Sequence, residues 1–210
     1  MGGWGGWGQP FDISGRVRFY AGGGGGGGNS SERGGDGMHG GGRGWGTTSS
    51  YDYNQYDTTS PPTATNGSSG GSFSLDAQAN LGGGGGAGSY WENNVGAWRY
   101  RGSGAGGSGI VIIRYPITPI PEFVPTVATG GTVSDVVDKD GHWRIHKFTS
   151  TGTTNFSVSQ VGTHGVEFLV VAGGGSGGNG GTTNANGGGG GGGVVHCTSY
   201  QITSTGDIPV

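Results

Sequence analysis

Two runs of seven consecutive glycines, Gly22–Gly28 and Gly187–Gly193, constrain the possible folds of this chain more than any other feature. Glycine has no side chain to bury, and it loses more conformational entropy on ordering than any other residue. An ordered run must therefore be held by backbone hydrogen bonds, each of which contributes about 1 kcal/mol net. The alternative is a flexible Gly/Ser linker, which would use the same residues.

Extended helices of the polyproline II type offer ordered glycine a way to satisfy its backbone. Such a helix has about three residues per turn, rises about 3.1 Å per residue and contains no internal hydrogen bonds. Its amides point outward, so neighbouring helices can bond to one another on a hexagonal lattice, in which an inner Cβ atom would hold the backbones apart. We predict that both runs, each spanning about 22 Å at that rise, form polyglycine II helices bonded to neighbouring glycine segments.

Short segments rich in β-branched and aromatic residues lie between the glycine-rich segments, and glycine interrupts every helical periodicity. They predict strands over residues 15–23, 108–116, 132–138, 142–149, 154–161, 166–172 and 194–210. Asp140-Gly141 and residues 150–153 separate three of these strands as turns, which predicts a meander. The predicted fold class is mainly β and irregular, with short antiparallel strands framing packed polyglycine II helices and almost no α-helix.

A proline-rich stretch divides the sequence. PITPIPEFVP, from Pro116 to Pro125, holds four prolines at spacings that favour an extended, semi-rigid linker. We therefore predict a first domain over residues 1–116, a linker over 117–130 and a second domain over 131–210.

Charge and motif content argue against several functions. A net charge of −3 argues against binding nucleic acid, because phosphate binders need a basic surface. The arginine/glycine-rich sequences at Arg33–Gly35 and Gly41–Gly46 are the features that would favour an RNA-binding tail. A P-loop requires Gly-Lys-Ser/Thr, whereas Lys139 and Lys147 follow Asp and His. Cys197 is the only cysteine, which excludes an internal disulfide and a cysteine-based zinc site.

No residue pattern indicates metal binding or catalysis. His142 and His146 have the spacing of a metal pair on a helix, but on a strand four residues span about 13 Å, so their rings cannot share one ion. We predict that both are solvated strand histidines, and the sequence shows no partner for His164 or His196. The segment 138–141 lacks the remaining ligands of a calcium loop and is predicted to be a hairpin turn. We therefore predict a protein that is not an enzyme and holds no metal or cofactor.

Aromatic residues on predicted loops are the strongest candidates for a binding site. Segments 45–63 and 89–102 combine Tyr and Trp with Asn, Asp, Glu and Arg. Such rings give large contact area at low entropic cost, and their polar neighbours supply adaptable hydrogen bonds, which suits a sugar or a protein surface. The candidate receptor-binding residues are Trp45, Tyr51, Tyr53, Tyr56, Tyr90, Trp91, Trp98 and Tyr100. The alternative is that these rings cap the ends of the glycine lattice.

Four motifs resemble parts of the glycine-rich domain common in tail-fibre and other surface proteins of bacteriophages. HKFTSTGTTNFSVSQVGTHGVEFLVVAGGGSGG (146–178) is similar to the opening of that domain, and GGGGGGGVVHCTSYQITSTGDIPV (187–210) to its next segment. GRVRFYAGGGGGGG (15–28) resembles a middle segment, and GSGAGGSGIVIIRYP (102–116) the closing strand. The glycine-rich tip adhesins of T-even-like phages are similar in architecture, with a packed core of polyglycine helices and loops that meet the host receptor.

The resemblance implies a non-enzymatic structural and host-recognition component of a bacteriophage tail or surface fibre, located on the virion surface or outside the cell. Its implied partners are other copies of itself or other fibre proteins, and a glycan or protein on the host cell surface. Nucleic acid and membrane insertion are not implied. One alternative is a self-assembling extracellular filament or matrix protein. Another is an ice-binding polyglycine bundle, which the long aromatic loops disfavour.

The order of the motifs departs from the family. The opening strand, 166–172, follows the closing strand, 109–115, so residues 1–116 would be the C-terminal part of one unit and 131–210 the N-terminal part of a second. This order predicts either a piece of a longer repetitive protein or subunits that complete one another head to tail. It also predicts that each of these apolar strands lacks its own complement within the chain.

Overall fold

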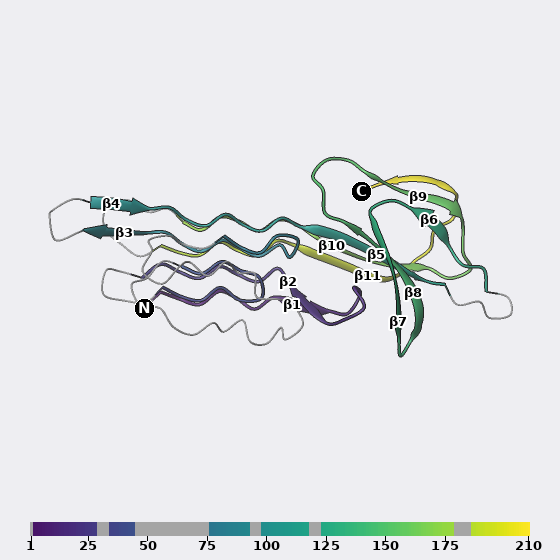
Figure 1. Ribbon diagram of the computed structural model, residues 1–210, viewed down its shortest axis with the longest axis horizontal. Helices are drawn as coiled ribbons and strands as arrows, with labels where there is room; N and C mark the ends of the chain where they lie inside the picture. The colour runs from purple at the N-terminus through teal and green to yellow at the C-terminus, as the bar shows by residue number, and fades with distance from the viewer. Residues whose placement is uncertain (1, 29–33, 45–75, 93–97, 118–122, 179–185) are drawn as a thin grey trace. The chain divides into compact units, whose positions relative to one another are not determined.

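The computed structural model describes residues 2–28, 34–44, 76–92, 98–117, 123–178 and 186–210 (Figure 1). The chain divides into two compact units. The glycine unit comprises Met1–Pro10, Phe19–Gly109 and Val171–Gly193, and the sheet unit comprises Phe11–Arg18, Ile110–Val170 and Val194–Val210. Each unit takes residues from both sides of the proline-rich stretch, so the units do not follow the boundary predicted at 117–130.

Strands are the regular elements of the described residues, which contain no helix, and the prediction of a mainly β fold is confirmed. The strands are β1 (Gln9–Phe11), β2 (Arg18–Tyr20), β3 (Ser89–Glu92), β4 (Trp98–Arg101), β5 (Ile110–Pro116), β6 (Val127–Thr129), β7 (Thr132–Asp138), β8 (Gly141–Phe148), β9 (Asn155–Gln160), β10 (Val166–Val171), β11 (Val194–Tyr200) and β12 (Gly206–Pro209). Within the ranges that the structure describes, no helix is long and apolar enough to span a membrane.

Two sheets build the sheet unit. One has five strands in the order β11-β10-β5-β8-β7, and the other has three in the order β12-β9-β6. β8 pairs antiparallel with β5 and β7, and β9 pairs antiparallel with β12 and β6. Buried apolar side chains from both sheets form one core, made of Ile113, Tyr115, Ala128, Phe148, Phe156, Val158, Val166 and Ile202.

The predicted three-strand meander is wrong in its last step. β7 and β8 form the expected hairpin, but β9 does not follow them in the sheet, because the other neighbour of β8 is β5. β9 pairs with β6 and β12 instead, and its alternate residues Phe156 and Val158 are buried in the core. Apolar alternation therefore marked β9 as a strand without indicating its partner.

The described part of the proline-rich stretch is packed against the sheet unit. Residues 127–129 form the edge strand β6, Thr126 is buried, and the Val124 amide donates to Thr163 Oγ1 over 3.2 Å. Proline favours extended backbone, which suits an edge strand as well as a linker. Residues 118–122 lie outside the described ranges.

The expectation that the two most apolar strands lack a complement within the chain is wrong. β5 and β10 are neighbours in the five-stranded sheet, where Ile112 and Leu169 are completely buried. The unusual order of the motifs is thus compatible with pairing inside a single chain. Bare edges on these strands therefore supply no reason for assembly with other copies.

Backbone hydrogen bonds between glycine-rich segments hold the glycine unit together. Along segment 21–28 the partner changes with each residue and repeats every third residue. The donor–acceptor pairs are Gly23–Gly6 and Gly26–Gly3 toward one neighbour, Gly24–Gly189 and Gly27–Asn186 toward a second, and Gly25–Gly42 toward a third, with N···O distances of 2.8–2.9 Å. This is the pattern expected of outward-pointing amides on a turn of three residues. The predicted bonding of both glycine runs to neighbouring glycine segments is confirmed.

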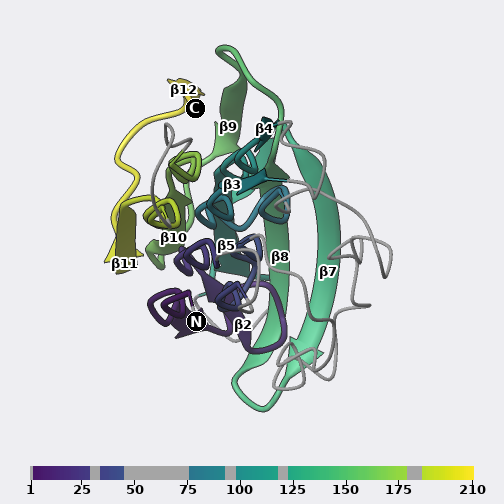
Figure 2. The same ribbon diagram turned by 90° about the vertical axis from the view of Figure 1, so that its left-hand side faces the viewer.

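Segment 82–88 is the most surrounded part of this hydrogen-bonded set, which we call the glycine lattice. It bonds to segments 21–28, 40–44, 102–109, 172–178 and 186–193, and every one of its residues is buried. Viewed end-on, the segments project as compact rings lying next to one another (Figure 2). A Cβ atom on Gly84 would lie 1.9 Å from the carbonyl oxygen of Gly189. Only glycine allows backbones to approach this closely.

Candidate functional site

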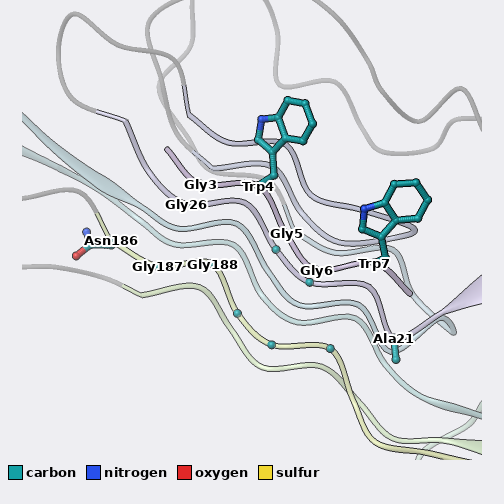
Figure 3. A pocket seen from close by; sticks show the side chains of 15 residues that line it. Gly3, Trp4, Gly5, Gly6, Trp7, Ala21, Gly26, Asn186, Gly187 and Gly188 are labelled. Carbon is teal, nitrogen blue, oxygen red and sulfur yellow. The ribbon is translucent and has the colours of Figure 1, made fainter. Parts of the chain in front are cut away.

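A groove with a volume of about 470 Å³ crosses the surface of the glycine unit (Figure 3). Segment 3–7 forms one wall, segment 186–191 forms the other, and the floor consists of Ala21, Gly23, Gly24 and Gly26. We call it the glycine groove. It is lined almost wholly by backbone, so the chemistry that it offers is that of peptide N–H and C=O groups.

Both walls of the glycine groove are hydrogen-bonded to the same floor. The floor donates to the first wall at Gly3 and Gly6, and to the second wall at Asn186 and Gly189. Among the described residues no backbone hydrogen bond joins the two walls directly. The groove is therefore a gap in the lattice with a well-defined width.

Two exposed tryptophans lie on the outer side of the first wall. Trp4 and Trp7 are 66% and 71% exposed, and their rings point to the same side of the segment and away from segment 186–191 (Figure 3). The Trp7 ring contacts the His39 ring edge-on, with 5.2 Å between the ring centroids, and the His39 ring stacks on that of Phe19, with 3.9 Å between the centroids. Sequence reasoning missed these tryptophans, although the repeat Gly-Gly-Trp-Gly-Gly-Trp signals them. Its period of three would place them on one side of an extended segment with three residues per turn.

Half of the predicted receptor-binding residues have a described backbone position. Trp45, Tyr51, Tyr53 and Tyr56 lie outside the described residues. Tyr90, Trp91, Trp98 and Tyr100 belong to the antiparallel hairpin of β3 and β4, in which Tyr90 is opposite Tyr100, Trp91 opposite Arg99, and Glu92 opposite Trp98. The hairpin directly continues lattice segments 82–88 and 102–109, and it lies beyond the ends of these segments at Gly88 and Gly102 (Figure 1). The structure thus brings these four predicted residues into one element.

A buried ion pair lies inside the sheet unit. Arg114 Nε lies 2.5 Å from Glu167 Oε2, and both residues are buried. Asp12 and Asp138 add carboxylate oxygens 3.7 and 3.8 Å from the same guanidinium. His196, for which the sequence showed no partner, lies 2.8 Å from Glu167 Oε1. An arginine enclosed by carboxylates inside a sheet has the geometry of a structural ion pair.

The prediction that His146 is solvated is wrong, whereas His142 is exposed as predicted. His146 Nδ1 lies 2.8 Å from the carbonyl oxygen of Gly130, so Nδ1 donates and Nε2 accepts from the Tyr115 hydroxyl at 3.1 Å. Burial lowers the pKa of His146, the bond to Gly130 opposes this, and the charge of Arg144 adds to the lowering. Burial also raises the pKa of Tyr115. Both side chains are therefore held neutral at physiological pH.

The predicted hairpin turn at 138–141 is confirmed. Asp138 Oδ1 accepts from the amides of Asp140 and Gly141, at 2.8 and 3.1 Å, and from Trp143 Nε1 at 2.9 Å. Burial acts to raise the pKa of Asp138, but these hydrogen bonds and the charge of Arg114 outweigh it and lower the pKa. The carboxylate is an internal cap of the turn.

The remaining titratable groups form no metal centre in the part of the chain that the structure describes. His164 Nδ1, for which the sequence also showed no partner, lies 3.2 Å from Thr163 Oγ1. Cys197 is a partly exposed free thiol. Comparison with protein-family profiles, with curated proteins and with solved structures finds no match to this chain.

Proposed function

We propose that this chain is a non-enzymatic structural and host-recognition component of a bacteriophage tail or surface fibre. In this proposal, polyglycine II helices build a rigid lattice that holds aromatic residues toward a glycan or protein on the host cell surface. The chain would act on the virion surface, next to other fibre proteins or further copies of itself. The resemblance of four sequence motifs to phage glycine-rich domains supports the proposal, and so does the following observation.

The hairpin of β3 and β4 carries the proposal. Its two strands continue directly from segments 82–88 and 102–109, which are hydrogen-bonded to each other and to the rest of the lattice. An aromatic hairpin at the end of such a block is positioned without a hydrophobic core beneath it. A preorganised aromatic surface loses little entropy on binding, which is the property that a receptor-binding tip requires.

The period-three hydrogen bonding supports the helical assignment of the glycine segments. A β-ladder returns to the same neighbour at every second residue, because successive groups point to opposite sides. Segment 21–28 returns to the same neighbour at every third residue and bonds on more than two sides. We infer that the segments are polyglycine II helices, because that conformation directs successive amides about 120° apart.

Binding of the purified, fluorescently labelled chain to a panel of bacterial strains and immobilised bacterial surface glycans tests the proposal. Two variants remove predicted contacts: Tyr90→Ala combined with Tyr100→Ala, and the triple Ala variant of Tyr51, Tyr53 and Tyr56. Tyr200→Ala is the matched control, because Tyr200 is an exposed tyrosine of the sheet unit. We expect both multiple variants to lose binding and the control to retain it.

Amide exchange of the glycine segments separates recognition from a structural role of the rings. Unchanged protection in variants that have lost binding supports receptor contact. If protection in segments 82–88 and 102–109 collapses together with binding, the rings cap the lattice, and the assignment of these residues is wrong. Retention of binding by both multiple variants, or absence of binding to every strain and glycan, would contradict the host-recognition role.

A further inference from the structure

The hydrogen bonds of residues 21–27 leave one side of this segment without a partner among the residues that the structure describes. Five sides are taken, by segments 2–8, 35–38, 40–44, 82–88 and 186–193. The carbonyl oxygens of Gly24 and Gly27 accept no hydrogen bond from the described residues. Donors and acceptors alternate around the segment, so these two carbonyls face the sixth side, between segments 2–8 and 186–193, where Gly24 lines the glycine groove.

The second wall presents donors to the same space. Segment 186–193 donates from Gly189 and Gly192 to segment 82–88, and its carbonyls bond to segments 21–28 and 172–178. The amides of Gly188 and Gly191 donate to no described residue. The alternation of donors and acceptors assigns them to the side next to the floor, which is again the glycine groove.

The first wall repeats this arrangement. Its Gly5 amide donates to the carbonyl of Asp36, and the carbonyls of Gly3 and Gly6 accept from the floor. The amides of Gly3 and Gly6 bond to no described residue, and the same alternation directs them into the groove. Across the groove, the first wall therefore presents amide donors, the floor presents carbonyl acceptors, and the second wall presents amide donors.

We propose that the glycine groove is an unfilled position of the lattice and binds one extended glycine-rich segment of a partner polypeptide. A chain in the three-residue turn has alternating acceptors and donors around its axis. It can therefore place carbonyls toward both walls and amides toward Gly24 and Gly27. This match uses only backbone groups, so the ligand is recognised by its conformation and by the absence of side chains at certain positions.

Steric limits set the sequence of the ligand. In the lattice each Cβ direction lies next to its own amide direction, as Gly189 shows: its amide donates to Gly85, and its Cβ would lie 2.1 Å from the carbonyl oxygen of Gly175 in the adjacent segment. A bound segment would point two of every three Cβ positions at the two walls and the third at solvent. The ligand therefore has the repeat Gly-Gly-X, in which X is any residue that tolerates an extended backbone.

Glycines on the open sides of the walls agree with this assignment. A Cβ atom on Gly3, Gly6, Gly187 or Gly190 would meet nothing within 4 Å, so the packing of this chain does not require glycine there. Glycine at such positions lowers stability through the greater conformational entropy of the unfolded chain. The neighbourhood of the groove is thus kept free of side chains beyond what internal packing demands.

A second copy of this chain is not the ligand that the structure favours. Its own Gly-Gly-Trp segment already forms the first wall, where the carbonyls of Gly3 and Gly6 are bonded to the floor. Inserting that segment into another copy would break these bonds in its own lattice. A separate glycine-rich chain loses no such bonds, so we assign the groove to a different polypeptide.

The test uses the purified full chain and the synthetic peptide acetyl-(Gly-Gly-Ser)4-amide at concentrations up to the millimolar range. Site-resolved amide exchange is followed at Gly3, Gly6, Gly188 and Gly191. We expect these four amides to exchange at least about tenfold more slowly with the peptide, because each gains a hydrogen bond. The control peptide acetyl-(Gly-Ala-Ser)4-amide carries a methyl group toward a wall and should leave the exchange unchanged.

Two single variants locate the binding in the groove. A Cβ on Gly26 would lie 3.1 Å from the Gly3 amide nitrogen and 3.3 Å from the Asn186 carbonyl oxygen, so Gly26→Ala places a methyl group between the walls. Gly193→Ala alters a glycine of the same segment that lies outside the lining of the groove, and its Cβ meets nothing within 4 Å. We expect Gly26→Ala to weaken peptide binding by about tenfold or more, as a steric block in a binding site does, and Gly193→Ala to have no effect.

Several outcomes would overturn the proposal. One is unchanged exchange at all four amides with the Gly-Gly-Ser peptide, and another is equal protection by the alanine peptide. Strong protection before any peptide is added would mean that the groove is already filled, by another part of this chain or, if the protection depends on protein concentration, by a second copy. If Gly26→Ala unfolds the glycine unit, the comparison of the two peptides still decides the question.

Discussion

Alanine at Gly84 is the sharpest test of the glycine lattice. Its Cβ would lie 1.9 Å from the carbonyl oxygen of Gly189, whereas real Cβ atoms essentially never come closer than 3.0 Å to another heavy atom. The contact involves backbone on both sides, so no flexible side chain can move away. Segments 82–88 and 186–193 would have to separate by roughly 1 Å, because close-packed interiors hold no spare volume.

The cost follows from the hydrogen bonds that join these two segments. The Gly189 amide donates to Gly85 over 2.8 Å, and the Gly192 amide donates to Gly82 over 2.7 Å. A separation of roughly 1 Å takes both distances beyond the range of a hydrogen bond. The two broken bonds leave four groups unsatisfied, three of them on the buried residues Gly82, Gly85 and Gly189. At about 1–3 kcal/mol for each buried group, the substitution costs roughly 3–9 kcal/mol. That is a large share of the stability of a typical domain, about 5–15 kcal/mol.

Gly190→Ala is the matched control, because the new Cβ meets nothing within 4 Å. It should leave the free energy of unfolding unchanged or raise it by about 0.4–1 kcal/mol, since alanine restricts the unfolded chain. Urea denaturation followed by tryptophan fluorescence, together with amide exchange of both glycine runs, measures the difference. Equal stability of the two variants, or free-solution exchange throughout Gly22–Gly28 and Gly187–Gly193 in the unsubstituted chain, would refute the lattice and favour the flexible linker.

Three further predictions concern the sheet unit. His146 is buried neutral with a lowered pKa, so the unfolded state binds more protons than the folded state in acid. The contribution of His146 to stability is therefore full above about pH 6.5 and falls as the pH drops below that value. Urea midpoints at pH 7.5 and 5 should show this loss of stability, and His146→Gln should make the loss smaller. Asp138→Ala should cost about 1–3 kcal/mol, because three donors, including Trp143 Nε1, lose their acceptor; Asp138→Asn keeps an acceptor oxygen and should restore most of the thermal stability. Glu167→Ala should destabilise the fold by removing the nearest carboxylate from the buried Arg114. The loss should be less than the about 3–5 kcal/mol of a buried charge left without a partner, because Asp12 and Asp138 remain 3.7 and 3.8 Å from the guanidinium. A second substitution, Arg114→Met, should recover part of the loss in thermal denaturation, and no recovery would contradict the ion-pair explanation.

Local sequence patterns were sufficient to locate most strands. The prediction over 132–138 coincides with β7, that over 166–172 extends one residue past the end of β10, and that over 142–149 is shifted by one residue from β8. Each segment is rich in β-branched or aromatic residues and is bounded by glycine, proline or a turn, so the local signal is strong. The turn at 138–141 could also be predicted from the sequence, because Asp and Gly are the residues that such a turn favours.

Local sequence patterns did not predict which strands pair with one another. The pairing of β5 with β10 and the separation of β9 from β8 are long-range facts, and apolar alternation specifies only which face of a strand is buried. The prediction that His146 is solvated was wrong for the same reason. A histidine on a strand is solvated or satisfied internally according to what lies opposite, here Tyr115 and the carbonyl of Gly130.

Glycine itself cannot specify which segment lies beside which, because every glycine offers the same donor and the same acceptor. The register must come from the residues that interrupt the glycine. Asn80 is one such residue: its amide donates to Ser108 Oγ over 2.9 Å, and Ser108 Oγ donates to Asn80 Oδ1 over 3.1 Å. Asn186 is another, because its Nδ2 donates to the carbonyl of Gly88 over 2.9 Å. These side-chain hydrogen bonds join segment 76–88 to segments 102–109 and 186–193. A shift of one segment along its neighbour by one residue would therefore break side-chain hydrogen bonds as well as backbone hydrogen bonds. The few polar side chains of the glycine unit thus fix an arrangement that glycine makes sterically possible but leaves degenerate.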